Sequence, residues 1–195
     1  MQDGINNNTN YAFNSNYGNY TYMYYTNSQA KTQLENWYQT NIGSKSDLAK
    51  NVASGNYYCE QAKVKYDDSY TSGSANMILY SSYTPDFKCA TDDNGKGLVN
   101  ASVGLLTYDE VVYAGGYYGQ SNTDYYLYNS AISWWLASSS GIVSSFSRLW
   151  IINGGGSIEQ LYSDSTSSLC AVLILNADTK ISSGNGTKEN PFVVE

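Results

Sequence analysis

The chain has 195 residues, a net charge of -7 and only 14% charged side chains. Its 10 Lys and Arg residues do not cluster, which argues against nucleic acid or an anionic membrane as the partner, since both are bound through basic patches. The absence of histidine excludes Ser-His-Asp and Cys-His catalysis and every His-dependent metal site.

Tyrosine is unusually frequent, with 21 residues, and many Asn, Ser and Gly residues accompany it. Binding loops favour this composition because Tyr offers a large, stiff contact area and Ser and Asn offer adaptable hydrogen bonds. The exposed strands of a secreted β-rich protein also use Tyr and Thr, so both interpretations stay open. The length fits one large domain, which we place at residues 22–195 after a linker-like segment at residues 1–21.

Local patterns in the first half predict two helices and little other regular structure. The stretch TYMYY at residues 21–25 is typical of a short strand. Ser28 then begins a helix that ends at Gly43. Its apolar face holds Ala30, Leu34, Trp37, Tyr38 and Ile42. A second short helix is expected at residues 46–53, followed by a loop-rich region to about residue 102.

Three cysteines indicate at most one disulfide within the chain. Cys59 and Cys89 could close a loop of thirty residues, and Cys170 lies in an apolar run that favours a buried free thiol. The chain lacks an apolar stretch of membrane-spanning length, and its start lacks a signal-peptide core. We expect either an intracellular protein or, favoured by the cysteine pair, an extracellular or cell-surface protein without its targeting segment.

Residues 92–95 read Asp-Asp-Asn-Gly and resemble part of a calcium loop. The acids are adjacent rather than alternate, and the distal Glu of such a loop is missing. This segment is therefore predicted to be a turn, and we expect no metal and no cofactor.

The segment GLLTYDEVVYAGG carries the clearest helix signal in the chain. Thr107 can cap the helix, Glu110 completes a capping box, and Gly115 supplies the left-handed stop. Asp109 and Glu110 could be read as an acid and base pair. Adjacent helix positions point about 100° apart, which favours the capping role.

The chain after this helix is predicted to be rich in strands, so the fold class is α+β. The expected strands are residues 124–129, 133–138, 147–153, 156–162 and 169–175, with a short strand at the C-terminus. Two of them flank Gly154–Gly156 and should form a hairpin. The run LCAVLIL is apolar throughout, which is typical of a central strand covered on both faces.

Several motifs lie along residues 22–195: AKTQLENWYQTNI, YCEQAK…FKC, VGLLTYDEVVYAGG, YYLYN, WIINGGGSI and LILNADTKISSGNGTKENPFVV. They carry a resemblance to a family of Tyr/Asn-rich, C-type-lectin-like bacterial surface domains found in gut Firmicutes. It implies two helices packed on a small, twisted antiparallel sheet with long loops, a fold shared with formylglycine-generating enzymes and retroelement-diversified variable proteins. Where family members read V-R-P-V, this chain has Leu169-Cys170-Ala171-Val172.

The resemblance implies a binding surface on the loops and late strands, residues 117–165. The expected contact residues are Tyr117, Tyr118, Trp135, Arg148, Trp150, Asn153, Glu159 and Tyr162. Because adjacent strand residues face opposite ways, we expect Trp134 inside and Trp135 exposed. Arg148 and Trp150 should share a face, either as a stacking-plus-charge site or as a core residue with a charged rim.

Several functions fit these patterns. We expect a non-enzymatic, adhesin-like module, monomeric, that binds a protein or glycan ligand on another cell or surface; its loops could be diversified. The alternative is a structural subunit or repeat of a surface appendage or wall protein. A carboxylate-based glycosidase is disfavoured because none of the 17 acids lies in a telling motif.

Overall fold

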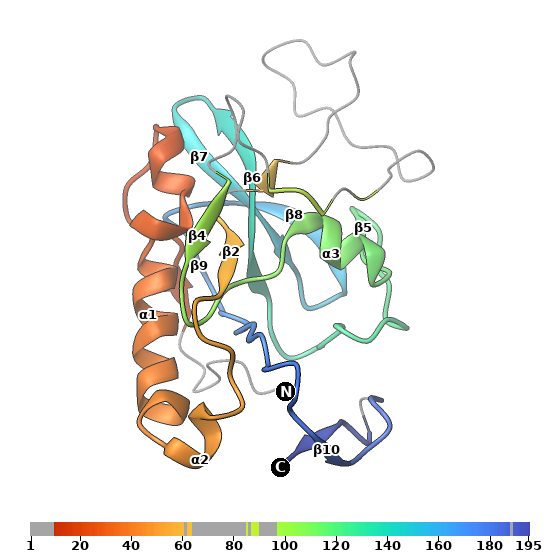
Figure 1. Cartoon of the computed structure of the whole chain (residues 1–195). Coiled ribbons are helices and arrows are strands. Elements are labelled where there is room, and N and C mark those ends of the chain that lie inside the picture. The colour runs from red at the N-terminus through yellow and green to blue at the C-terminus, as the bar shows by residue number, and fades with distance from the viewer. Residues whose placement is uncertain (1–9, 61, 64–84, 86, 90–96, 188) are drawn as a thin grey trace.

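The computed structural model describes residues 10–60, 62–63, 85, 87–89, 97–187 and 189–195 (Figure 1). The chain is a mixed α+β fold around a five-stranded sheet of order β3-β6-β7-β8-β5. In chain order the strands of this sheet are β3 (Ala62–Lys63), β5 (Tyr117–Tyr118), β6 (Trp134–Val143), β7 (Phe146–Ile152) and β8 (Ser157–Tyr162). The three long strands are antiparallel, and the two short edge strands pair in parallel. The hairpin predicted across Gly154–Gly156 is confirmed as β7 and β8.

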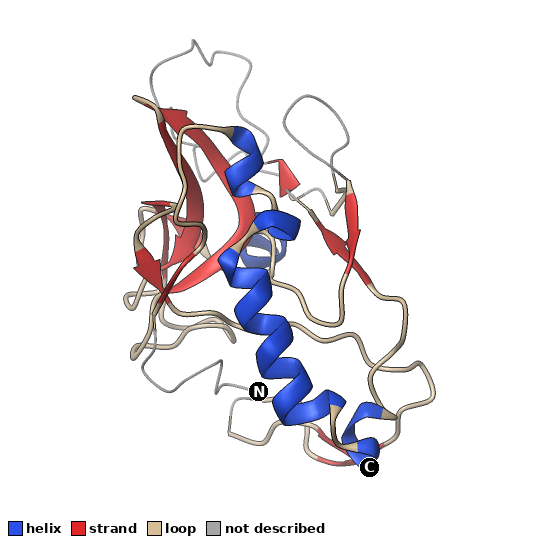
Figure 2. Ribbon diagram, turned by 90° about the vertical axis from the view of Figure 1, so that its left-hand side faces the viewer, coloured by secondary structure: helices blue, strands red, loops and turns tan. Residues whose placement is uncertain are grey.

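Three small antiparallel pairs surround the main sheet. They are β1 (Tyr11–Ala12) with β9 (Thr166–Ser167), β2 (Tyr57–Cys59) with β4 (Leu98–Asn100), and β10 (Ile181–Ser183) with β11 (Val193–Val194). The terminal strand expected from the sequence is thus β11. The C-terminal pair lies beside the end of the first helical segment, where Asn51 donates a hydrogen bond to the carbonyl of Glu195 (Figures 1 and 2).

The first predicted helix forms α1 (Gln29–Tyr38) and continues through a π-helical turn, η3 (Gln39–Gly43), to its predicted end. Ser28 is the N-cap, and its hydroxyl accepts a hydrogen bond from the Lys31 amide at 2.9 Å. Figure 2 shows α1 as the longest helix of the fold. A shorter helix, α2 (Ser46–Ala49), follows within the range predicted for it.

Residues 21–25 were predicted to be a strand, and this prediction is wrong. They form parts of two 3₁₀ helices, η1 (Tyr20–Met23) and η2 (Tyr25–Asn27). The Asn19 side chain accepts a hydrogen bond from the Thr21 amide and so begins η1. Met23 and Tyr25 are buried, and their packing outweighs the β propensity of the Tyr-rich stretch.

Residues 10–21 belong to the folded domain, so the predicted linker boundary at residue 22 is wrong for them. β1 pairs with β9, and Phe13 is fully buried with its ring edge 5.9 Å from Trp135. The Phe13 carbonyl also accepts the Gln29 amide at the start of α1. This segment therefore covers one face of the sheet, which sequence patterns alone did not indicate.

The helix α3 (Tyr108–Tyr113) confirms the predicted capping box. The Glu110 carboxylate accepts from the Thr107 amide at 2.7 Å, and the Thr107 hydroxyl accepts from the Glu110 amide at 3.3 Å. Gly115 ends the helix with a φ of 108°. The Ser138 hydroxyl of β6 accepts from the Tyr108 amide at 2.8 Å, which fixes the helix on the sheet.

Two hydrophobic cores lie on the two faces of the sheet, with α1 and α3 on opposite sides (Figure 1). We call them the α1-side core and the α3-side core. The α1-side core includes Phe13, Leu34, Trp135, Leu149 and Ile151. The α3-side core includes Tyr108, Trp134, Leu136, Trp150 and Ile152. Each sheet face therefore packs against its own helix.

Two further strand predictions are wrong. Residues 124–129 form turns, with the Tyr128 amide bonded to the Tyr125 carbonyl. Residues 169–175 make only isolated bridges, Val172 with Gly104 and Leu175 with Val52. The central positions of the sheet belong to β6 and β7, so this apolar run packs along the edge of the α1-side core instead.

The structure joins Cys59 and Cys89 in a disulfide with Cα atoms 5.2 Å apart, the pairing considered from the sequence. Cys170 is a free thiol, and burial raises its pKa.

The turn expected at residues 92–95 lies outside the described residues. Among the helices of the described part, none is long and apolar enough to cross a membrane.

Candidate binding surface on the late strands

Trp135 was predicted to be an exposed contact residue, and that prediction is wrong. Its side chain is 0% exposed and lies in the α1-side core. The indole N–H donates to the Tyr11 carbonyl at 2.8 Å, so the residue binds the N-terminal segment to the sheet. The expectation of an outward Trp assumed one solvated sheet face, whereas both faces are covered here. Trp134 is buried, as predicted.

Trp150 is also buried, at 1% exposure, so it offers no surface to a ligand. It shares a sheet face with Arg148, as predicted, but α3 covers its end of that face. The Tyr108 and Tyr118 rings lie 4.9 and 5.1 Å from it. Tyr118 is therefore part of the core lining, and its neighbour Tyr117 is 41% exposed.

Asn153 and Glu159 lie together at the β7–β8 turn. The Asn153 Oδ1 accepts hydrogen bonds from the Gly155 and Ser157 amides, and its Nδ2 donates to the Glu159 carboxylate. These contacts shape the turn, in which Gly156 has a φ of 78°. Both predicted residues thus hold the hairpin in place, at the opposite end of β7 from Arg148.

Arg148 and Tyr162 are the predicted contact residues that the structure brings together. They are register partners across β7 and β8. The guanidinium carbon lies 4.6 Å from the centre of the Tyr162 ring, and Nη2 donates to the Tyr162 hydroxyl at 2.8 Å. Nη1 donates to the side-chain Oε1 of Gln160 at 3.4 Å. The side chain of Arg148 is therefore held in one orientation and remains half-exposed.

Two aromatic residues that the sequence analysis missed extend this pair. Phe146 lies 5.2 Å from Tyr162, and Tyr17 stacks on Phe146 at 4.8 Å with the rings 22° apart. Tyr17, Phe146 and Tyr162 are 49%, 36% and 39% exposed. We call these three residues and Arg148 the aromatic–arginine cluster. Strand alternation from Arg148 could have found Phe146, but no local signal connects Tyr17 with the strands.

The tight turn between β6 and β7 places Phe146 in the cluster. Val143 pairs with Phe146 across two residues, Ser144 and Ser145, that both have positive φ angles, 50° and 70°. This geometry matches the twist of a hairpin, but it is costly for residues other than glycine. The turn therefore keeps Phe146 at the tip of the sheet at a local conformational cost.

Gly18 brings Tyr17 against the hairpin. Its amide donates to the Ser147 hydroxyl at 3.1 Å, and that hydroxyl donates to the Asn19 carbonyl. A Cβ at Gly18 would lie 2.9 Å from the Ser145 carbonyl oxygen, and the φ of Gly18 is +87°. Only glycine allows this close approach without strain, so Gly18 determines where the Tyr17 ring lies.

The charge of Arg148 is not neutralised within the described part of the chain. The ion pair found there joins Lys31 to Glu35, and no described carboxylate lies within ion-pair distance of Arg148. Its register partner on β6 is Gly141, where a Cβ would meet no atom within 4 Å. Among the described residues, the guanidinium contacts the Tyr162 ring and the Gln160 side chain, and the neighbouring Gly141 adds no side chain beside it.

The described residues contain no group of three His, Cys, Asp or Glu side chains placed to hold a metal ion.

A scan against protein-family models, a search of curated proteins and a search of solved structures each found no match.

Proposed function

We propose that this chain is a non-enzymatic binding module of a secreted or surface protein that recognises a carboxylate-bearing ligand through the aromatic–arginine cluster. The observation that carries the proposal is Arg148, which lies over the exposed Tyr162 ring without an acidic partner among the described residues. Tyr and Arg are the side chains most enriched at the energetic centres of binding surfaces.

Preorganisation supports this role for Arg148. Binding must order flexible side chains, and a guanidinium already held by Tyr162 and Gln160 has lost that freedom before the ligand arrives. Arginine has five N–H donors, of which two are used here, so donors remain for a carboxylate. The net charge of -7 opposes an anion only over a short range, because physiological salt screens charges beyond about 8 Å.

The fold supports the same proposal. A sheet with three long antiparallel strands, helices on both sides and long connecting segments is compatible with the C-type-lectin-like arrangement that we propose for residues 10–195. The disulfide between Cys59 and Cys89 favours an oxidising compartment and therefore an extracellular location. A bacterial surface origin and diversification of the loops remain part of this proposal.

The test is binding of the purified chain to an array of glycans and peptides that includes matched carboxylated and uncharged members. We expect selective binding of carboxylated ligands, with a Kd that rises about tenfold or more in Arg148→Gln. Tyr162→Phe keeps the ring but removes the hydroxyl that orients Arg148, and it should weaken binding less. High salt should weaken binding of the wild type more than that of Arg148→Gln.

Tyr57→Ala is the matched control, because Tyr57 is 59% exposed on β2, outside the cluster. It should leave binding unchanged. Equal binding of carboxylated and uncharged ligands, or equal affinities of the wild type and Arg148→Gln, would contradict the proposed site.

The alternative role, a subunit of a surface assembly, is favoured by one observation. Apolar side chains at the C-terminal strand pair are exposed, including Ile181 at 56%, Phe192 at 55% and Val193 at 50%. Exposed apolar patches often mark contacts between chains. Sedimentation at increasing concentration tests this role: self-association that Phe192→Ser abolishes would favour the assembly, and a monomer throughout would exclude assembly through this surface.

A further inference from the structure

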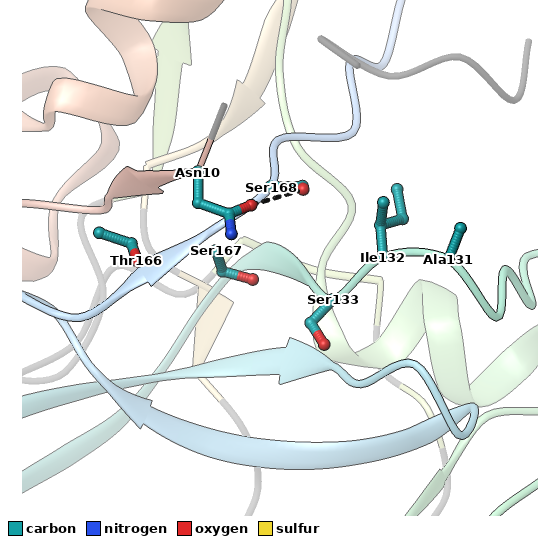
Figure 3. Close-up of a pocket in the computed structure, with 7 residues that line it drawn as sticks. All are labelled: Asn10, Ala131, Ile132, Ser133, Thr166, Ser167 and Ser168. Atoms are coloured by element: carbon teal, nitrogen blue, oxygen red, sulfur yellow. Dashed lines mark hydrogen bonds between the residues drawn. The ribbon is translucent and has the colours of Figure 1, made fainter. Parts of the chain in front are cut away.

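A pocket of about 410 Å³ lies at the other end of β6 from the aromatic–arginine cluster. Asn10 and residues 166–168 border one side of it, and residues 131–133 border the other (Figure 3). Ser133 directly precedes the first residue of β6, whereas Phe146 of the cluster lies just beyond Val143, the last residue of β6. A strand of this length spans roughly 30 Å, so the two sites are separate.

The described residues that line the pocket are mostly polar, and none of them carries a charge. Five of its side chains carry a hydroxyl or an amide, those of Asn10, Ser133, Thr166, Ser167 and Ser168. The remaining described residues of the lining, Ala131 and Ile132, are apolar, and none of the described lining residues is ionisable. This composition disfavours an ion or a purely apolar molecule as ligand and favours a neutral molecule with many hydrogen-bonding groups.

Ser167 is the residue that points to a ligand. Its side chain is 2% exposed, and its hydroxyl has no hydrogen-bond partner among the described residues. In Figure 3 this hydroxyl projects from β9 toward the Ser133 side of the pocket. A buried hydroxyl without a partner destabilises a fold, so such groups are rare and require an explanation. A ligand hydroxyl in the pocket would provide the missing hydrogen bond.

The neighbouring groups retain hydrogen-bonding capacity as well. The Ser133 hydroxyl accepts from the Gly154 amide at 3.2 Å, which leaves its own proton for donation. The Asn10 Oδ1 accepts from the Ser168 hydroxyl at 3.0 Å, which leaves the Asn10 amide protons for donation. Hydroxyl groups both donate and accept, so a ligand with several hydroxyls matches this mixture.

Backbone hydrogen bonds hold the two sides of the pocket in fixed positions. The Ser168 amide donates to the Ser133 carbonyl at 2.8 Å, and the Trp135 amide donates to the Ser168 carbonyl at 3.1 Å. Ser167 pairs with Tyr11, whose carbonyl accepts the Trp135 indole N–H. The pocket is therefore preformed. The Trp135 indole is hydrogen-bonded to Tyr11, which directly follows the lining residue Asn10 in the chain.

We infer that the pocket binds a neutral monosaccharide unit, either free or at the end of a glycan, with the Ser167 hydroxyl as the central hydrogen-bonding group. The volume of about 410 Å³ lies within the range of roughly 300–1,000 Å³ that small-molecule sites occupy, which is ample for one sugar ring. The inference is independent of the cluster, whose guanidinium would select a charged ligand.

The test is a titration of the intact, ¹⁵N-labelled chain with glucose, galactose, mannose and N-acetylglucosamine, followed by NMR. We expect at least one sugar to give saturable shifts of the Trp135 indole N–H and the residue 166–168 amides, with a Kd on the order of 1 mM for so small a ligand. Chemical shifts are the readout because sugars at high concentration stabilise proteins without binding.

Two variants test where the sugar binds, and a third tests whether this site is separate from the aromatic–arginine cluster. Ser167→Ala removes the unpartnered hydroxyl without disturbing a hydrogen bond, so it should fold normally and raise the Kd about tenfold. Ala131→Trp should block the exposed side of the pocket. Arg148→Gln should leave sugar binding unchanged, whatever its effect on carboxylated ligands.

Two results would overturn the inference. One is the absence of saturation with every neutral sugar up to about 100 mM, two orders of magnitude above the expected Kd. The other is saturable binding that keeps the same Kd in both Ser167→Ala and Ala131→Trp.

Discussion

Trp134 and Trp135 are adjacent in the chain and lie in different hydrophobic cores. Trp134 packs in the α3-side core and Trp135 in the α1-side core, each with at most 2% of its side chain exposed. Strand geometry places neighbouring residues on opposite faces, so a pair of large aromatic residues can support both layers at one position of β6. The Trp pair therefore anchors β6 in both hydrophobic cores.

Replacing Trp135 should destabilise the protein strongly. Trp135→Ala removes a buried ring and the indole hydrogen bond to Tyr11, so we expect a loss of about 3–5 kcal/mol in the free energy of unfolding. Urea denaturation followed by circular dichroism measures this loss. Trp37→Ala on the half-buried face of α1 is the control and should cost less. Equal losses for the two variants would contradict the burial that separates them.

The turn between β6 and β7 should be improved by glycine. Ser145 has a φ of 70°, a region that penalises every residue with a Cβ, so Ser145→Gly should stabilise the protein by about 0.5–1 kcal/mol. The melting temperature and the urea midpoint should both rise. A decrease in stability would show that the serine side chain makes a contact that outweighs the strain.

Gly18→Ala should have the opposite effect on the same part of the molecule. The added methyl group would meet the Ser145 carbonyl at 2.9 Å on a backbone with a φ of +87°, so we expect a loss of about 1–2 kcal/mol. Because Gly18 positions Tyr17, the variant should also weaken ligand binding at the cluster. Gly55→Ala is a matched control, since Gly55 has a φ of +70° but no atom within 4 Å of its Cβ position.

Reduction of the disulfide should destabilise the fold without abolishing the two cores. Cys59 and Cys89 are 30 residues apart, and the loss of this cross-link should lower the free energy of unfolding by about 3–4 kcal/mol in the chain-entropy account. Comparison of urea midpoints for the native protein and Cys59→Ser/Cys89→Ser measures the difference. A variant as stable as the native protein would show that the disulfide contributes nothing to the folded state.

Stability should be constant around neutral pH and fall above pH 10. Burial raises the pKa of Tyr58 and Tyr125 to about 12, and burial with the nearby Glu35 carboxylate also raises the pKa of Tyr25. Below pH 10 these phenols are protonated in both the folded and unfolded states. Between pH 10 and 12 the unfolded chain loses protons that the folded chain retains, so the free energy of unfolding decreases. Urea midpoints from pH 7 to 11.5, with tyrosinate absorbance, follow this change.

Tyr125→Phe separates one of these contributions. The Tyr125 hydroxyl is buried without a hydrogen-bond partner among the described residues, so its removal should be neutral or slightly stabilising at pH 7. The variant should also lose less stability than the wild type between pH 10 and 11.5. An unchanged alkaline profile would contradict the raised pKa of Tyr125.

Local sequence patterns were sufficient where neighbouring residues determine the structure. Ser28 and Thr107 have the side-chain oxygens that cap α1 and α3, and Gly115 has the backbone freedom that ends α3. Gly154–Gly156 between two alternating segments indicated the β7–β8 hairpin.

Long-range packing decided what the sequence patterns could not. The N-terminal segment covers the sheet face on which Trp135 was expected to be exposed. Residues 169–175 make only isolated bridges, because β6 and β7 occupy the central positions of the sheet. The Tyr17 ring stacks on Phe146. The hydrogen bond from Gly18 to Ser147, two residues 129 positions apart in the sequence, joins the two segments. The sequence by itself determined caps, turns and strand alternation, because these depend on residues a few positions apart. Only the tertiary structure decided which faces are covered and which side chains meet, because burial is a property of the whole chain.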